Sequence, residues 1–231
     1  MKQKQPGRGP RAALGTILFI TLALSAVYSL VRVLITPSIM PDGGVYTNTR
    51  SDYLLMLVQC VLGLAVFSLP SLLSHRWKQD LPNFVYVLYY VFLYCAIFLG
   101  EVLDFYYTVP HWDTILHFFS GAMLGALGFI LVSVLNDSEN VPISLSPAFV
   151  ALFAFCFALS CGAVWEIYEF TVDGLMGLNM QKVITATGET LAGREALSDT
   201  MKDIIIDACS AALVAVAGYV RLKTGKSVSE G

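Results

Sequence analysis

Three ionisable residues lie inside three different apolar stretches of this sequence: His117, Glu166 and Asp207. A charged side chain near the centre of a membrane-spanning helix costs about 2.5–3.5 kcal/mol on insertion scales, so residues of this kind usually serve a function. Imidazole nitrogen and carboxylate oxygen together suit Zn²⁺, Mn²⁺ or Mg²⁺. The three residues therefore predict a site for a divalent metal whose ligands are His117, Glu166 and Asp207.

Further carboxylates recur at helical spacing beside these residues. Asp113 lies four residues before His117, and Asp203 lies four residues before Asp207. Residues four apart share one face of an α-helix, so each pair can reach the same site. Another carboxylate, Glu101, closes an earlier apolar stretch. We therefore expect the site to include additional members, which are Glu101, Asp113 and Asp203.

A hydrolytic metal site also needs a group that accepts a proton from metal-bound water. Glu169 lies three residues after Glu166 on the same helical face, and His111 lies just before the apolar stretch that contains His117. Carboxylates and imidazoles are the side chains that most often act as general bases. We therefore expect Glu169 or His111 to fill the catalytic role.

Two of the carboxylates also fit a purely structural role at the start of a helix. Asp113 follows Pro110 closely, and an acid in a first helical turn is stabilised by the helix dipole. Thr200, followed three residues later by Asp203, matches a capping box that would start the sixth apolar helix at Asp203. Spacing alone leaves both roles open.

Six apolar stretches are long enough to form helices that cross a membrane. A hydrocarbon core about 30 Å thick needs about 20 residues at a rise of about 1.5 Å per residue. Turn-forming Pro, Gly and Asn residues separate the stretches, and neither an internal repeat nor a soluble domain is visible. We therefore predict an all-α, polytopic membrane helix bundle in a single domain over 14–222, with spans at about 14–35, 53–73, 84–103, 112–135, 146–170 and 204–222.

Lysine and arginine residues flank the predicted spans unevenly. They collect before the first span, between the second and third, and after the sixth, which are segments on one side of a six-span protein. Cytoplasmic loops carry an excess of basic residues, so we expect both termini to be cytoplasmic, as tails over 1–13 and 223–231. The His/carboxylate cluster then lies at the non-cytoplasmic face. The basic residues are Lys2, Lys4, Arg8, Arg11, Arg76, Lys78, Arg221, Lys223 and Lys226.

The composition agrees with a chain that has lipid as its main partner. Of the 231 residues, 56% are hydrophobic and only 13% are charged, against about 25% charged in a soluble domain. The formal net charge is −3, which does not suit a nucleic-acid partner. The composition also excludes a disordered chain and a disulfide-rich secreted scaffold.

Three motifs in this order resemble the YjdF family of bacterial inner-membrane proteins. They are His111-Trp112-Asp113-x3-His117, Trp165-Glu166-x2-Glu169 and Asp199-x3-Asp203-x3-Asp207. The order of His, Glu and Asp is more distantly similar to VanZ-like membrane proteins, although the Asp-Lys pair usual before the VanZ histidine is absent here. The resemblance implies a multi-pass protein of the bacterial cytoplasmic membrane, and it names no activity.

The sequence leaves three classes of function in competition. The first is a metal-dependent enzyme that acts on envelope lipids or lipid-linked substrates, because the cluster falls at headgroup depth. The second is a proton- or cation-coupled transporter, which uses the carboxylates as its ion site. The third is a structural or sensory membrane protein whose acids bind a cation or a partner subunit. The substrate, the oligomeric state and the identity of the metal are not encoded in any motif.

Overall fold

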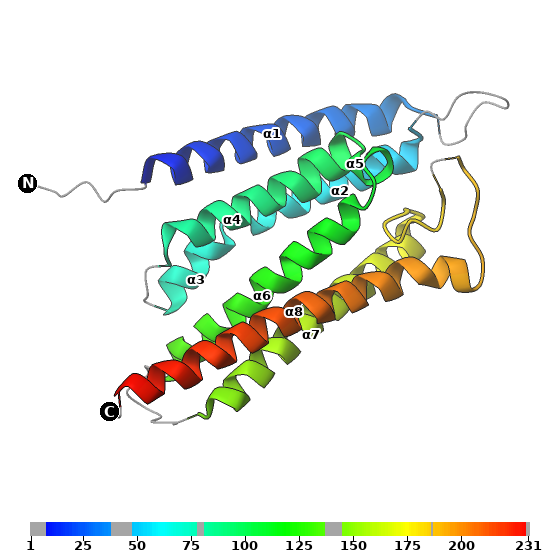
Figure 1. Cartoon of the computed structure of the whole chain (residues 1–231). Coiled ribbons are helices and arrows are strands. Elements are labelled where there is room, and N and C mark those ends of the chain that lie inside the picture. Colours follow the sequence, from blue (N-terminus) through cyan, green and yellow to red (C-terminus); the bar gives the residue numbers. More distant parts are fainter. Residues whose placement is uncertain (1–7, 38–47, 78–80, 137–144, 186, 230–231) are drawn as a thin grey trace, which may run out of the picture. The chain divides into compact units, whose positions relative to one another are not determined.

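The computed structural model describes residues 8–37, 48–77, 81–136, 145–185 and 187–229. Most of these residues are helical, and they contain no β-strand, only one isolated antiparallel bridge between Ile184 and Thr190. Figure 1 shows the order of the elements along the chain. They are α1 (Arg8–Ile35), α2 (Arg50–Val66), α3 (Leu69–Trp77), α4 (Asn83–Leu93), the π-helix η1 (Tyr94–Val102), α5 (Phe105–Thr108), α6 (Trp112–Asn136), α7 (Pro147–Met176) and α8 (Arg194–Ser229).

Six helical segments among the described residues are long and apolar enough to cross a membrane, which confirms the all-α class and the expected number of spans. The second span is broken between α2 and α3, next to Pro70, because proline cannot donate the hydrogen bond that would continue the helix. The third span changes from α-helix to π-helix at Tyr94. The six segments are Gly9–Ile35, Arg50–Trp77, Asn83–Val102, Trp112–Ser133, Pro147–Met176 and Arg194–Thr224.

Several helices extend beyond the apolar stretches that predicted them. Helix α1 begins at Arg8 rather than at residue 14, α7 ends at Met176 rather than at residue 170, and α8 runs from Arg194 to Ser229 rather than over 204–222. Hydropathy marks only the part of a helix that lies in lipid, whereas the backbone hydrogen bonds continue into water. The remaining tail residues, 1–7 and 230–231, lie outside the described residues.

The chain forms two compact units, and the expected single domain over 14–222 stays a prediction. The first unit comprises Met1–Trp112 and Val172–Leu191. Its core includes Leu22 and Cys60, which have no exposed surface. Gly63 lies so close to Ile97 and Leu22 that a methyl group at this position would overlap the Ile97 side chain.

The second unit comprises Asp113–Thr171 and Ala192–Gly231, and it contains most of α6, α7 and α8. Small residues let these helices approach closely, as the spacing of glycines in α6 suggests. A Cβ at Gly128 would lie 2.8 Å from the Ala154 Cα of α7, and one at Gly125 would lie 3.3 Å from the Val214 side chain of α8. This close packing positions the polar residues described next.

Candidate metal centre

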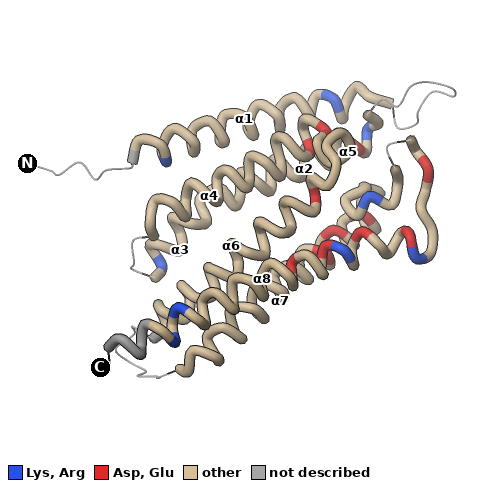
Figure 2. Tube along the Cα trace, viewed as in Figure 1, with Lys and Arg blue, Asp and Glu red and all other residues tan. Residues whose placement is uncertain are grey.

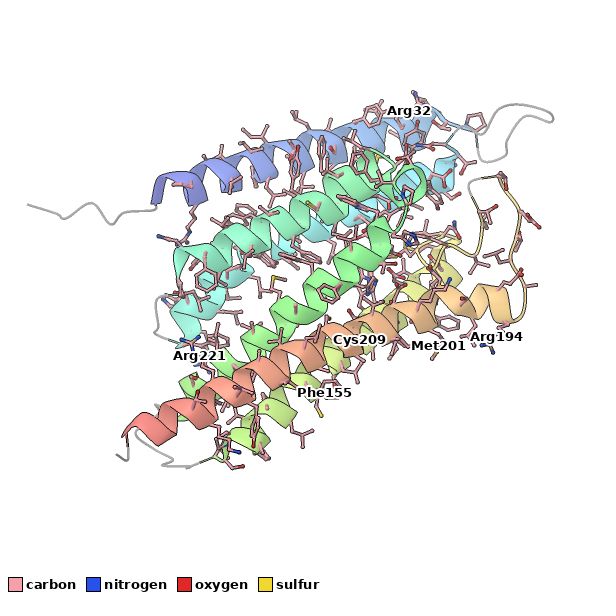
Figure 3. The ribbon with its side chains drawn as sticks, viewed as in Figure 1. Arg32, Phe155, Arg194, Met201, Cys209 and Arg221 are labelled. Carbon is pink, nitrogen blue, oxygen red and sulfur yellow. The ribbon has the colours of Figure 1, made fainter. Side chains whose placement is uncertain are left out.

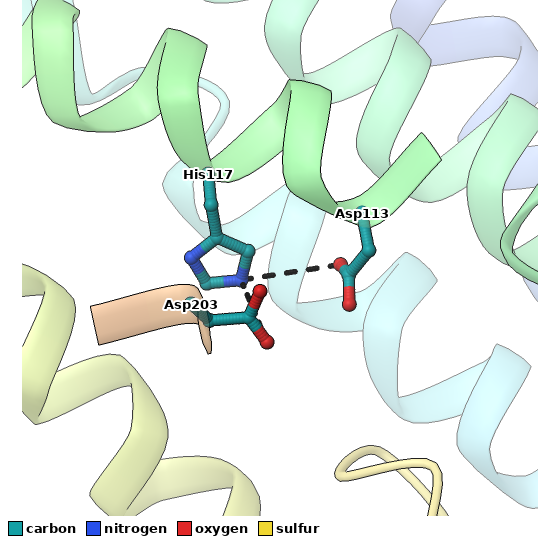
Figure 4. Close-up of side chains that lie close together, drawn as sticks. All are labelled: Asp113, His117 and Asp203. Atoms are coloured by element: carbon teal, nitrogen blue, oxygen red, sulfur yellow. Dashed lines mark ion pairs between the residues drawn. The ribbon is translucent and has the colours of Figure 1, made fainter. Parts of the chain in front are cut away.

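His117 is the central residue of a polar cluster inside the second unit. It lies one turn after Asp113, which occupies the first turn of α6, and its exposed fraction is only 7%. Both side chains point from α6 toward α8, where Asp203 faces them (Figure 4). Each of the three helices of this unit contributes at least one carboxylate to the surroundings of the imidazole.

The Nε2 atom of His117 faces three carboxylates at nearly equal distances. Asp113 Oδ1 lies at 3.9 Å, Glu166 Oε1 at 3.8 Å and Asp203 Oδ2 at 4.0 Å. These distances exceed the 2.7–3.2 Å of a typical hydrogen bond. They are instead close to the separation of two ligand atoms that bind the same metal ion.

The other ring nitrogen of His117 faces a fourth carboxylate. The distance from Nδ1 to Asp207 Oδ2 is 3.4 Å, which is the shortest of the four contacts. Asp207 comes from α8, one turn after Asp203, and its exposed fraction is 2%. The structure therefore divides the carboxylates into three at Nε2 and one at Nδ1.

Two carboxylate oxygens of the cluster are buried without a hydrogen-bond partner among the described residues. They are Glu166 Oε1 and Asp207 Oδ1. Glu166 is 4% exposed, and the hydrogen bond of its carboxylate with Thr200 leaves Oε1 facing His117. A buried carboxylate oxygen without a partner is costly, so the arrangement requires a cation or a proton to balance it.

The donor set suits a divalent metal. One atom each from Asp113, His117 and Asp203 lies within 4.8 Å of the other two. Two ligands at about 2.1 Å from one ion are at most about 4.2 Å apart, so shifts of less than about 1 Å would close the site. The cluster combines one nitrogen with several carboxylate oxygens, which is a borderline-to-hard ligand set.

Acidic residues of the second unit gather at one end of its helices, at the start of α6, near the end of α7 and in the first half of α8 (Figure 2). Arg194 lies at the same end of α8, whereas Arg221 lies at the opposite end (Figure 3). Arg194 and Lys202 are exposed, in contrast to the buried carboxylates. The acidic charge is therefore concentrated where the metal centre would form.

The capping-box role expected for Asp203 is wrong. Helix α8 begins at Arg194, so Asp203 lies well inside it, with an exposed fraction of 4%. Asp113 does lie in the first turn of α6, as a dipole-stabilised acid would, but it also faces His117. Both aspartates therefore belong to the cluster.

The four contacts of His117 described above do not include the three other candidate residues. Glu169 is buried in α7, one turn beyond Glu166 and 8% exposed. His111 and Glu101 belong to the first unit, where His111 is exposed with a φ of 59° and Glu101 lies in the π-helix η1. The charge of Lys182 acts on Glu101 in that unit. Their membership of the metal centre stays a prediction.

Two groups near the end of η1 have pKa values above their ordinary range. Burial and the Asp52 carboxylate raise the pKa of Asp104, against the hydrogen bond with Asn48 that lowers it. Burial also raises the pKa of the Tyr107 hydroxyl, which accepts a hydrogen bond from the Asn179 amide at 3.0 Å. These groups belong to the first unit and mark a polar region there.

Asp173 has a structural role that the sequence pattern missed. Its carboxylate accepts the backbone N–H groups of Met180 at 2.8 Å and Gln181 at 2.9 Å. Helix α7 ends next to it, where Gly177 adopts a φ of 65° and donates to the Asp173 carbonyl at 2.9 Å. Asp173 thus fixes the chain that leaves α7.

Replacing Asp173 with alanine is expected to destabilise the first unit by about 2–4 kcal/mol, because two hydrogen bonds to a charged acceptor are lost. Amide hydrogen exchange across 177–185 should then become faster. Glu189→Ala, at an exposed position of the same connection, is the matched control and should leave exchange unchanged. Equal exchange in the Asp173 variant and the wild-type protein would contradict this role.

Comparison with known proteins places the chain in a family without an assigned activity. It is 26% identical over 215 residues to a protein of Thermotoga maritima described only as uncharacterized, and the match covers 92% of each chain. No solved structure matches the chain. The family described as a predicted membrane protein (DUF2238) matches residues 43–224, so this multi-pass membrane chain belongs to the DUF2238 family.

Proposed function

We propose that the second unit binds one divalent metal ion inside the membrane-spanning region. The observation that carries this proposal is the set of three carboxylate oxygens at 3.8–4.0 Å from His117 Nε2. One of these oxygens, the buried Glu166 Oε1, has no hydrogen-bond partner among the described residues, and this supports the proposal because such an oxygen needs a cation or a proton.

The metal ligands in this proposal are His117, Asp113, Glu166 and Asp203. This set keeps His117 and Glu166 from the sequence-based prediction and moves Asp207 out of it, because Asp207 faces the opposite nitrogen. One imidazole with three carboxylates suits Mn²⁺ or Zn²⁺, and the carboxylates alone suit Mg²⁺. Soft metals, which prefer thiolates, are disfavoured by this set.

The activity we propose is metal-dependent hydrolysis or group transfer on an envelope lipid or lipid-linked substrate. A bound divalent ion lowers the pKa of a water ligand and polarises a phosphoryl or carbonyl oxygen. Glu169, buried one turn from Glu166, is our candidate general base. The gathering of the acidic residues at one end of the three spanning helices supports a headgroup as substrate.

A second candidate function is proton- or cation-coupled transport. It is favoured by the excess of four carboxylates over one imidazole, which protons can also balance.

We further propose that both termini are cytoplasmic and that the protein resides in a bacterial inner membrane, as the basic residues and the YjdF-like motifs suggest. A structural or sensory role is the outcome left if neither metal nor transport is found.

Elemental analysis of the purified protein in detergent tests the metal proposal. We expect about one divalent ion per chain. Asp203→Asn and Glu166→Gln should each weaken metal binding strongly, because each removes a direct ligand. Loss of a residue that only supports a ligand costs about 10–100-fold in affinity, and we expect these two variants to lose more. The matched control is Glu195→Gln, which removes one exposed acid from the first turn of the same helix as Asp203. A folded wild-type protein that binds no Mn²⁺, Zn²⁺ or Mg²⁺ would overturn the proposal and favour transport.

A further inference from the structure

We propose that Asp207 is a positioning residue that orients His117 for the metal. The inference rests on the metal site proposed above and concerns the nitrogen that does not face the three ligand carboxylates. In this arrangement, His117 Nδ1–H donates to Asp207 Oδ2, and the lone pair of Nε2 is directed at the site. Asp207 therefore selects one of the two tautomers of the neutral imidazole.

The four distances support this division of roles. Asp207 Oδ2 is 3.4 Å from Nδ1, whereas the carboxylates of Asp113, Glu166 and Asp203 lie 3.8–4.0 Å from Nε2. A carboxylate can only accept a hydrogen bond, so the ring nitrogen that faces Asp207 must carry the proton. Metal-binding histidines commonly donate their second N–H to a carboxylate, which fixes the ring and increases its basicity.

Two glycines on neighbouring helices make room for Asp207. A Cβ at Gly162 of α7 would overlap the Asp207 carboxylate, with the Asp207 Cγ only 2.9 Å away. A Cβ at Gly121 of α6 would lie 3.1 Å from both the Cα and the carbonyl oxygen of Asp207. The carboxylate thus lies against the α7 backbone, and the α8 backbone approaches α6 at the same level.

The cost of this arrangement also points to a role beyond stability. Asp207 is 2% exposed, and its Oδ1 has no hydrogen-bond partner among the described residues. Replacing a buried ion pair by apolar residues of similar volume is often neutral or stabilising. The contact with His117 Nδ1 accounts for an aspartate in this place.

Nitrogen NMR of the metal-free protein labelled with ¹⁵N-histidine tests the inference. The chain has three histidines, and the spectrum of His117→Gln identifies the signal of His117. In spectra recorded at alkaline pH, where the metal-free imidazolium has lost one proton, we expect the ring of wild-type His117 to keep its remaining proton at Nδ1. Asp207→Ala should lose this preference and bind Mn²⁺ or Zn²⁺ about 10–100-fold more weakly. Asp207→Asn should fall between the two, because the amide oxygen still accepts a hydrogen bond but carries no charge.

Ser210→Ala is the matched control. Ser210 is buried one turn further along α8 and donates to the Asp207 carbonyl at 3.1 Å, and this contact does not involve the carboxylate. We expect it to keep both the tautomer and the metal affinity. A neutral ring that carries its proton at Nε2 rather than at Nδ1 in the metal-free wild-type protein would overturn the inference while leaving the metal site in place. Absence of metal binding would overturn the proposed function, whereas the tautomer would still decide the role of Asp207.

Discussion

Replacing His117 with alanine is expected to destabilise the second unit by about 3–5 kcal/mol, the usual cost of removing one partner from a buried charge cluster. Four carboxylates lie within 4.0 Å of the imidazole, so its loss leaves them to repel one another. We also expect metal binding to disappear. Thermal unfolding in detergent, with and without a chelator, measures both effects.

The control for this variant is His75→Ala, which removes an exposed imidazole of α3 in the first unit. It should change the unfolding temperature little and leave metal binding intact. A chelator should lower the stability of wild-type protein and of the His75 variant but not that of the His117 variant. An unfolding free energy of His117→Ala within about 0.5 kcal/mol of wild type, the range usual for surface substitutions, would contradict the central position of His117.

Replacing Gly162 with alanine is expected to displace the Asp207 carboxylate from His117. The added methyl group would overlap that carboxylate, and overpacking of a buried site costs about 1–3 kcal/mol. The metal affinity should fall together with the stability, because Asp207 can no longer orient the imidazole. Chemical denaturation and metal titration of the same preparation measure the two effects.

A double-mutant cycle separates this specific contact from general crowding of the helices. In an Asp207→Ala background the carboxylate is absent, so Gly162→Ala should cost almost nothing further. The control is Gly174→Ala on the same helix, where a Cβ meets no atom within 4 Å. That variant should be neutral or stabilising by about 0.5–1 kcal/mol, the helix preference for alanine over glycine. Equal costs in both backgrounds would show that Gly162 acts through helix packing alone.

Several features of this protein follow from the sequence by itself. Each membrane span depends on the local hydropathy of about 20 neighbouring residues, so all six spans could be predicted without a structure. The sequence also singles out His117 and Glu166 as candidates, since a polar residue in an apolar stretch is conspicuous wherever the helix packs. Both residues are buried, and their role as metal ligands stays a prediction.

Tertiary structure alone decided how the polar residues divide around the imidazole. Whether a carboxylate meets Nε2 or Nδ1 depends on the rotation and spacing of helices that are far apart in sequence, and glycines such as Gly162 set that spacing. Asp203 and Asp207 are four residues apart and share one face of α8, so the sequence cannot distinguish their roles. In the structure, Asp203 faces Nε2 of His117 and Asp207 faces Nδ1. The contact of Asp173 with the chain beyond α7 was hidden for the same reason, because its partners are backbone groups that no sequence pattern reports.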